Sequence, residues 1–136
     1  MLDPYTLILM AIMVCREAQF EPTQGQLAVA QTVLNRADFP GWWGKSPAEI
    51  ITFPMQYSPM TDPKDPQLTF WPSPRGASLK GCLRVAEDAL KRISPVIVKG
   101  ADSFYAVTMK KPPTWAMPGT FVAQIGGHIF HNTDGR

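Results

Sequence analysis

The stretch VCREAQFEPTQGQLAVAQTVLNRA, residues 14–37, carries two glutamates four positions apart, directly before a Pro-Thr break. Side chains upstream of the break recur at the helical spacing of three and four: Leu7, Met10, Val14 and Glu17. This pattern predicts a helix over residues 4–18 with Asp3 as its N-cap, so that Glu17 lies at the end of an apolar stripe. Burial and the negative helix terminus both favour the neutral form of a carboxyl group there. Glu17 is therefore a candidate general acid, and an ordinary hydrated charge is the alternative.

Two more helices are predicted by their start signals. Thr23 and Gln26 have the spacing of a capping box, which predicts a helix over about residues 24–36. The sequence SPAE, residues 46–49, repeats this signature and predicts a short helix that ends near Phe53. These signals place a second and a third helix directly after the first.

The next segment is rich in proline and is followed by a fourth predicted helix. Six prolines between positions 54 and 74 indicate an extended, structured loop region, and such loops are more often functional than idle. A helix is expected over about residues 77–93. Its expected buried stripe consists of Leu79, Leu83, Ala86, Leu90 and Ile93.

The final third has the pattern of short strands. Residues 96–98 and 104–108 are expected as strands, and residues 121–125 with 128–131 as a hairpin around Gly126-Gly127. The stretch 110–119 between them is expected as a loop. Residues 1–136 are thus expected to form one α+β domain, mainly α-helical with a small antiparallel sheet or hairpin in the C-terminal third.

Composition argues against several classes of function. The net charge of the 136 residues is only +2, which gives no basic patch for nucleic acid. The apolar run 5–14 is about half the length of a membrane span, and no basic residue precedes it as in a signal peptide. We expect no stable membrane insertion, and a protein made in the cytoplasm and delivered by another route.

The cysteines and histidines do not have the spacing of a metal site. Cys15 and Cys82 are expected as buried thiols. With His128 and His131 they form no C-x-x-C or H-x-x-x-H pattern, and a structural zinc site needs four ligands. We expect no metal and no cofactor.

Three segments together resemble one known family: REAQFEPTQGQLAVAQTVLNR at 16–36, MQYSP at 55–59 and IGGHIFH at 125–131. They are similar to the SleB-type cell-wall hydrolase family, which includes the catalytic domains of spore-cortex-lytic enzymes and related phage lysins. Arg16 stands where the family has glycine, and Tyr57 replaces a phenylalanine. The resemblance implies a lysozyme-like fold and cleavage of peptidoglycan between N-acetylmuramic acid and N-acetylglucosamine.

The resemblance places the family's catalytic glutamate at Glu17. As a lytic transglycosylase, Glu17 would protonate the glycosidic oxygen and then accept the proton of the muramic C6 hydroxyl, which leaves 1,6-anhydromuramic ends. The alternative is a hydrolytic N-acetylmuramidase, which needs a second carboxylate about 5 to 9 Å away. The candidates for that carboxylate are Glu21, Asp62 and Asp65.

Four residues are candidates for binding the sugar: Gln56, Tyr57, Ser58 and Tyr105. The aromatic rings offer flat faces for stacking on sugars, and Gln56 can hydrogen-bond an N-acetyl group. Holding the loop is the alternative for Gln56. Four tryptophans expected in loops, at positions 42, 43, 71 and 115, are further candidates.

Two other function classes remain open at this point. A peptidoglycan-binding module would hold glycan strands without chemistry at Glu17, and an amidase or peptidase would cleave the peptide part. The expected partner in each case is peptidoglycan, with the protein a monomer acting in the periplasm or outside the cell. A phage endolysin with holin-dependent delivery fits this architecture, and so does an excised or virion-associated catalytic domain.

Overall fold

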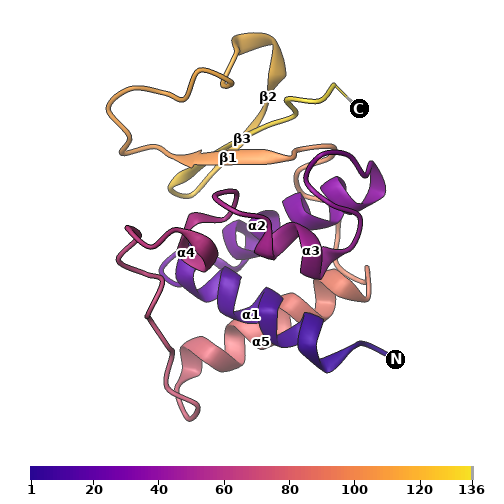
Figure 1. Ribbon diagram of the computed structural model, residues 1–136, viewed down its shortest axis with the longest axis vertical. Coiled ribbons are helices and arrows are strands. Elements are labelled where there is room, and N and C mark those ends of the chain that lie inside the picture. Colours follow the sequence, from indigo (N-terminus) through magenta and orange to yellow (C-terminus); the bar gives the residue numbers. More distant parts are fainter. Residues whose placement is uncertain (136) are drawn as a thin grey trace.

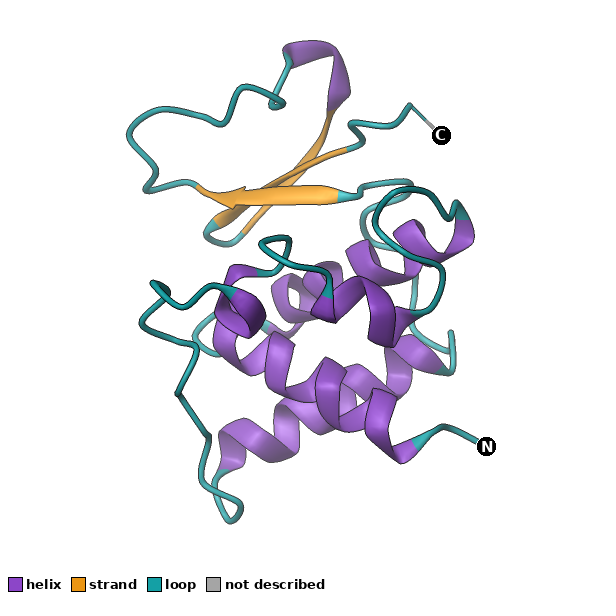
Figure 2. Ribbon diagram, viewed as in Figure 1, coloured by secondary structure: helices purple, strands orange, loops and turns teal. Residues whose placement is uncertain are grey.

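The computed structural model describes residues 1–135, in which a layer of helices carries a small sheet on one side (Figure 1). The elements in chain order are α1 Pro4–Ala18, α2 Thr23–Asp38, α3 Pro47–Thr52, α4 Ser58–Thr61, α5 Ala77–Leu90, β1 Ser103–Ala106, the 3₁₀ turn η1 Pro118–Thr120, β2 Phe121–Ile125 and β3 His128–His131. Figure 2 shows the separation of the helical and sheet-bearing halves. The predicted α+β class is confirmed.

Helix α1 begins as predicted and runs through the core. The carboxylate of Asp3 accepts hydrogen bonds from the backbone N–H of Thr6 at 3.1 Å and from its hydroxyl at 2.9 Å. Pro4 occupies the first turn, where no backbone donor is needed. Residues 10–16 are all buried, so the helix is fixed by contacts on every side in its second half. Glu17 lies in the last turn of this rigid element.

The capping box predicted for α2 is wrong. Pro22 is the N-cap, no side chain caps the helix, and Thr23 already lies inside the first turn. The side-chain amide of Gln26 donates instead to the carbonyls of Ala18 at 3.1 Å and Gln19 at 3.3 Å. These carbonyls end α1 and would otherwise lack partners, so Gln26 joins the two helices. In α3 the predicted box does form, because Ser46 Oγ accepts from the N–H of Glu49 at 3.2 Å.

Helix α5 packs against α1 and α2, with a different stripe from the one predicted. Its buried residues are Cys82, Val85, Ala86 and Ala89. Of these four, only Ala86 belongs to the predicted stripe, because small side chains let the helices approach while the larger leucines lie half-buried at the edges. The helix ends at Leu90, and Ile93 is 68% exposed. Cys15 and Cys82 are both buried and unbridged, as predicted.

The three-stranded antiparallel sheet has the order β1-β3-β2. The predicted hairpin of β2 and β3 is confirmed, and Gly126 in its turn has a φ of +55°. Residues 96–98 are not a strand, which corrects the prediction. The side-chain amide of Gln31 on α2 bonds this segment instead, accepting from the N–H of Ile97 at 2.9 Å and donating to the carbonyl of Pro95 at 2.6 Å.

The proline-rich region 54–74 is ordered by contacts with α1 and contains the short helix α4, which was not predicted. Arg16 donates to the carbonyls of Phe70 at 2.9 Å and Pro59 at 3.2 Å. Its guanidinium also lies 4.9 Å from the centre of the Trp71 ring. The arginine that replaces the family's glycine therefore holds this loop against the helical layer.

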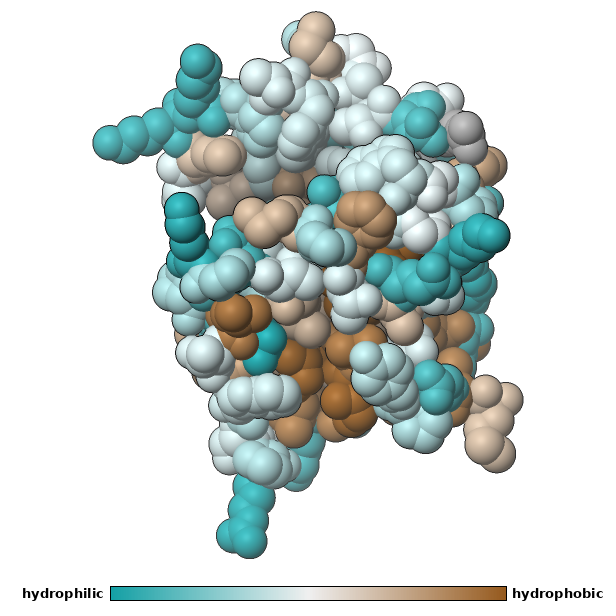
Figure 3. All heavy atoms as spheres, viewed as in Figure 1, coloured by the Kyte–Doolittle hydropathy of each residue, from teal (hydrophilic) through white to brown (hydrophobic). Residues whose placement is uncertain are grey.

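The surface differs between the two halves of the molecule. On the face shown in Figure 3, the most apolar side chains gather over the helical half, and the sheet-bearing half is mostly of intermediate hydropathy. Within residues 1–135, no helix combines the length and apolar character needed to cross a bilayer.

Candidate active site

A cavity of about 860 Å³ lies between the helical layer and the sheet. Its walls come from the ends of α1 and α2, from the loops around α4, and from β1 and β3. Both Glu17 and the four predicted sugar-binding residues line it. Residues distant in the sequence are thus brought to one concave site, the usual form of a site for a small or extended ligand.

Glu17 is half-buried in the wall of this cavity. Loss of hydration raises the pKa of its carboxyl group to about 8, and the negative charge of Asp65 contributes in the same direction. The group is therefore largely protonated near pH 7 and can donate a proton to a bound ligand. This is the protonation state that the sequence analysis predicted for a general acid.

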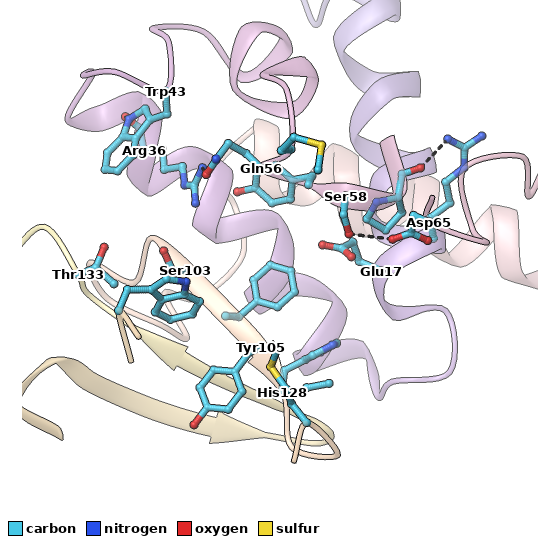
Figure 4. Close-up of a pocket in the computed structure, with 18 of the residues that line it drawn as sticks. Glu17, Arg36, Trp43, Gln56, Ser58, Asp65, Ser103, Tyr105, His128 and Thr133 are labelled. Carbon is cyan, nitrogen blue, oxygen red and sulfur yellow. Dashed lines mark hydrogen bonds between the residues drawn. The ribbon is translucent and has the colours of Figure 1, made fainter. Parts of the chain in front are cut away.

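Asp65 lies beside Glu17 at the same end of the cavity (Figure 4). One of its carboxylate oxygens accepts from the hydroxyl of Ser58 at 2.7 Å, and the other accepts from the backbone N–H of Gln67 at 2.8 Å. Both oxygens thus have partners that fix the orientation of the group. The structure brings Glu17, Ser58 and Asp65 together from α1, α4 and the loop that follows α4.

The other two candidate carboxylates point elsewhere. Glu21 accepts from the backbone N–H of Gly127 at 2.5 Å and lies 3.9 Å from Nδ1 of His128, so it joins the start of α2 to the hairpin turn. Asp62 accepts from the N–H of Lys64 at 2.9 Å. Neither Glu21 nor Asp62 is among the residues that line the cavity.

Tyr57 and Tyr105 occupy different positions in the wall. Tyr57 is 2% exposed, its hydroxyl lies 3.0 Å from that of Thr32, and burial raises its pKa. It forms the buried floor of the cavity. Tyr105 packs edge-on against Trp115 with 5.9 Å between ring centres, and it stacks on His131. Of the two tyrosines, Tyr105 presents the more accessible face to a ligand.

The comparison with known families accounts for the arrangement as a whole. The profile of the cell wall hydrolase family matches residues 20–131. The chain belongs to the cell wall hydrolase family. The matched segment runs from the end of α1 to the end of β3, and Glu17 lies just before it. The resemblance seen in the sequence is confirmed, and the hydrolase is an enzyme of peptidoglycan cleavage.

The fold has a counterpart among solved structures. The hydrolase superposes on the catalytic domain of the germination-specific lytic transglycosylase SleB from Bacillus anthracis with a TM-score of 0.70 and 23% identity. The match covers 96% of each chain. It confirms the lysozyme-like fold. No curated protein sequence matches the hydrolase significantly.

Arg36 also lines the hydrolase's cavity, although it is not among the candidate site residues predicted from the sequence. Arg36 and Trp43 both line its wall, and the indole N–H of Trp43 donates to the Arg36 carbonyl at 3.0 Å. Arg36 had been recognised only as part of the family motif. The feature of the sequence that could have indicated Arg36 is its position. It is a positively charged residue on the same face of the helix as the apolar residues Val29 and Val33.

Of the two histidines of the hydrolase, His128 lines the cavity and His131 does not. His128 lines the cavity against the ring of Phe104, at 5.1 Å between centres, and burial lowers its pKa. His131 Nδ1 lies 2.9 Å from the hydroxyl of Thr120. Within residues 1–135, no three His, Cys, Asp or Glu side chains form a group that could hold a metal ion.

Proposed function

We propose that the hydrolase cleaves the glycan strands of peptidoglycan between N-acetylmuramic acid and N-acetylglucosamine, as a lytic transglycosylase with Glu17 as its acid and base. The observation that carries this proposal is the Glu17 carboxyl group, with a pKa of about 8, in the wall of the cavity. The SleB domain that shares its fold is described as a lytic transglycosylase, which supports the same chemistry here.

The reaction requires two proton transfers at one group. Protonated Glu17 donates its proton to the glycosidic oxygen, the bond from C1 to that oxygen breaks, and the N-acetylglucosamine side leaves as an alcohol. The resulting Glu17 carboxylate then accepts the proton of the muramic C6 hydroxyl while O6 bonds to C1. The strand ends in 1,6-anhydromuramic acid, Glu17 is protonated again, and no water is consumed.

Sugar binding is proposed for the residues that line the cavity around Glu17. Gln56, Ser58 and Tyr105 offer an amide, a hydroxyl and an aromatic face to a strand lying along it. Tyr57 supports them from the floor through its buried ring. An extended polar ligand suits this mixture of hydrogen-bonding and stacking groups.

Hydrolysis by a muramidase is the second candidate, because Asp65 lines the same cavity and its charge acts on Glu17. Two carboxyl groups across the scissile bond would satisfy the two-carboxylate mechanism. The hydrogen bonds from Ser58 and Gln67 to Asp65 favour a role in setting the pKa of Glu17 over a role as nucleophile.

The products separate the two reactions. Purified sacculi digested in H₂¹⁸O should give muropeptides that end in 1,6-anhydromuramic acid, carry no ¹⁸O and are lighter by one water than hydrolytic products. Mass spectrometry measures both features. Labelled reducing ends would assign hydrolysis and make Asp65 the candidate second carboxylate. Products cleaved only in the peptide would contradict glycan cleavage altogether.

A further inference from the structure

Arg36 is a buried cation in the cavity wall, and it forms no ion pair with a carboxylate within residues 1–135. It is 5% exposed, and its Nε donates to the backbone carbonyl of Asp102 at 2.7 Å. One terminal nitrogen, Nη1, reaches Gln56 Oε1 at the long distance of 3.4 Å. Within residues 1–135, the ion pairs do not include Arg36, and its Nη2 has no hydrogen-bond partner. The guanidinium therefore keeps unused donors at a site that it also lines.

The groups around Arg36 stabilise its charge without using these donors. The guanidinium lies 5.0 Å from the centre of the Trp43 ring and 5.2 Å from that of Tyr57. Aromatic faces favour a cation, but they leave its N–H groups free for an oxygen acceptor. The two rings also hold the planar group in a fixed orientation.

The nearby carboxylate of Asp102 is engaged with the C-terminal segment. One oxygen accepts from the N–H of Thr133 at 3.1 Å and from its hydroxyl at 2.8 Å. The other oxygen accepts from the N–H of Asp134 at 3.0 Å. Asp102 thus meets Arg36 through its backbone carbonyl, and its carboxylate serves to anchor residues 133 and 134.

A desolvated guanidinium without a counter-ion is costly to the folded protein and well suited to bind an acceptor oxygen. Burial of a charge is offset by its partners, and here a further partner can come from a ligand in the cavity. The planar fork of arginine matches a carboxyl group in particular. The site therefore favours a carboxylate or carbonyl oxygen of the bound strand.

Arg36 lies away from the reacting group. In Figure 4, Arg36 and Trp43 stand at one end of the cavity, Glu17 and Asp65 at the other, with Gln56 between them. An oxygen bound by Arg36 therefore belongs to a part of the strand displaced from the scissile bond. Its recognition affects which glycan binds and not the proton transfers themselves.

We propose that Arg36 binds the carboxyl-derived oxygen on the lactyl arm of a muramic acid residue, so that the hydrolase distinguishes peptidoglycan from a plain N-acetylglucosamine polymer. This inference rests on the proposed glycan substrate. Acetamido carbonyls occur on both sugars of the strand, whereas the lactyl arm occurs only on muramic acid. A site that binds the lactyl arm therefore distinguishes the two polymers.

The test measures binding to Glu17→Gln protein, which keeps ligands intact, by calorimetry with three oligosaccharides of equal length. The first is a chitin oligosaccharide without lactyl arms, the second carries free lactyl carboxylates, and the third carries neutral lactyl amides. A hydrogen bond to a charged group contributes about 1.5–3 kcal/mol, so the free-carboxylate ligand should bind about tenfold or more tighter than chitin. Tight binding of the amide ligand as well would support recognition of the lactyl carbonyl, which is amide-linked in peptidoglycan, and tight binding of the acid alone would contradict the proposal.

Paired variants assign this preference to Arg36. In Glu17→Gln/Arg36→Met the preference should fall to about twofold or less, and in Glu17→Gln/Arg84→Met, which removes an exposed arginine of α5, it should persist. If the methionine variant fails to fold, Glu17→Gln/Arg36→Lys takes its place, because lysine keeps the positive charge and removes the guanidinium. With the parent protein, the Nε–H NMR signal of Arg36 should shift on addition of the muramyl ligand and not of chitin.

Three results would overturn the inference and leave the proposed function standing: equal affinity of the parent for all three ligands, tight binding of the acid alone, or a preference that survives loss of the Arg36 guanidinium. Failure of every glycan to bind would overturn the proposed function and the inference with it.

Discussion

Among single residues, Glu17 carries the chemistry that we propose, and its environment sets its protonation. The side chain follows a buried helical turn, and its pKa is raised to about 8 by desolvation and then by Asp65. Arg16 and Ala18 on either side are buried, so the group has little freedom to move into solvent. A carboxyl group held in this way can donate a proton near neutral pH, as the proposed reaction requires.

Replacing Glu17 by glutamine should remove activity and keep the fold. Glutamine has nearly the same volume but no proton to transfer, so release of soluble muropeptides should fall about 10²-fold to 10⁴-fold. Glu87→Gln, on the exposed ion pair with Lys91, is the matched control. Retained activity above about one-tenth of wild type in Glu17→Gln would contradict Glu17 as the acid and assign the cleavage to another group.

The Tm of Glu17→Gln, compared with that of wild type across a range of pH, tests the raised pKa of Glu17. Because the folded form holds its proton more tightly than the unfolded form, the protonated Glu17 stabilises the fold at low pH, and that stability is lost between about pH 4.5 and 8. Glu17→Gln should therefore match wild type in Tm near the lower pH and exceed it above the higher one.

Asp65→Asn should move the alkaline limb of the pH–rate profile to lower pH. The charge of Asp65 raises the pKa of Glu17, so its removal makes Glu17 lose its proton at lower pH. Asp62→Asn, outside the cavity, should leave the limb unchanged. Complete inactivation of Asp65→Asn at every pH would instead indicate that Asp65 reacts as the second carboxylate.

Among the elements, the helix starts differ in how their backbone donors are satisfied. Helix α3 has a side-chain cap from Ser46, whereas α2 begins with Pro22 and has none. The junction of α1 and α2 depends on Gln26, which bonds two terminal carbonyls of α1. This junction fixes the position of α2, and hence of Arg36, relative to Glu17.

Ser46→Ala should lower the free energy of unfolding by about 1 kcal/mol, because α3 loses its cap. Thr23→Ala at the start of α2 should lower the free energy of unfolding by only a few tenths of a kcal/mol, since Thr23 is not the cap there. Urea denaturation of both variants measures the difference. A cost for Thr23→Ala as large as that for Ser46→Ala would show that Thr23 caps α2 in solution.

In the molecule as a whole, hydrogen bonds of three side chains hold the walls of the cavity together. Glu21 bonds the backbone of the hairpin turn, and Arg36 bonds the backbone next to β1. On the other side of the cavity, Arg16 holds the loop that contains α4. These three side chains set the width of the site, although only Arg16 and Arg36 line it.

Gly126→Ala should weaken the contact between the helical layer and the sheet. A Cβ at this position would clash with the carboxylate of Glu21, and the φ of +55° is itself strained for alanine. The variant should lose more than about 1 kcal/mol of stability. Gly81→Ala in α5 has open space and a helical position, so it should gain about 0.5–1 kcal/mol. Equal melting temperatures for the two variants would contradict this account.

The prediction from sequence succeeded where one local pattern settles the structure. Asp3 before a proline correctly predicted the start of α1, and the Gly-Gly pair correctly predicted the hairpin turn. The spacing of the apolar residues correctly predicted that Glu17 lies at the end of α1. It failed where distant groups compete for the same backbone. Gln26 bonds α1 instead of closing its own cap, and Gln31 takes up the backbone of residues 95–97, so no strand forms there.

The sequence by itself determined the family, the α+β class and the candidate acid, because motifs and periodicity depend on near neighbours. Only the tertiary structure decided which carboxylate accompanies Glu17 and which cation lines the cavity with it. Glu21 is nearer than Asp65 in sequence, yet it is drawn to the hairpin turn while the α4 loop carries Asp65 into the cavity. Desolvation and charge depend on such distant contacts, so the pKa of Glu17 and the unpaired state of Arg36 arise only in the folded chain.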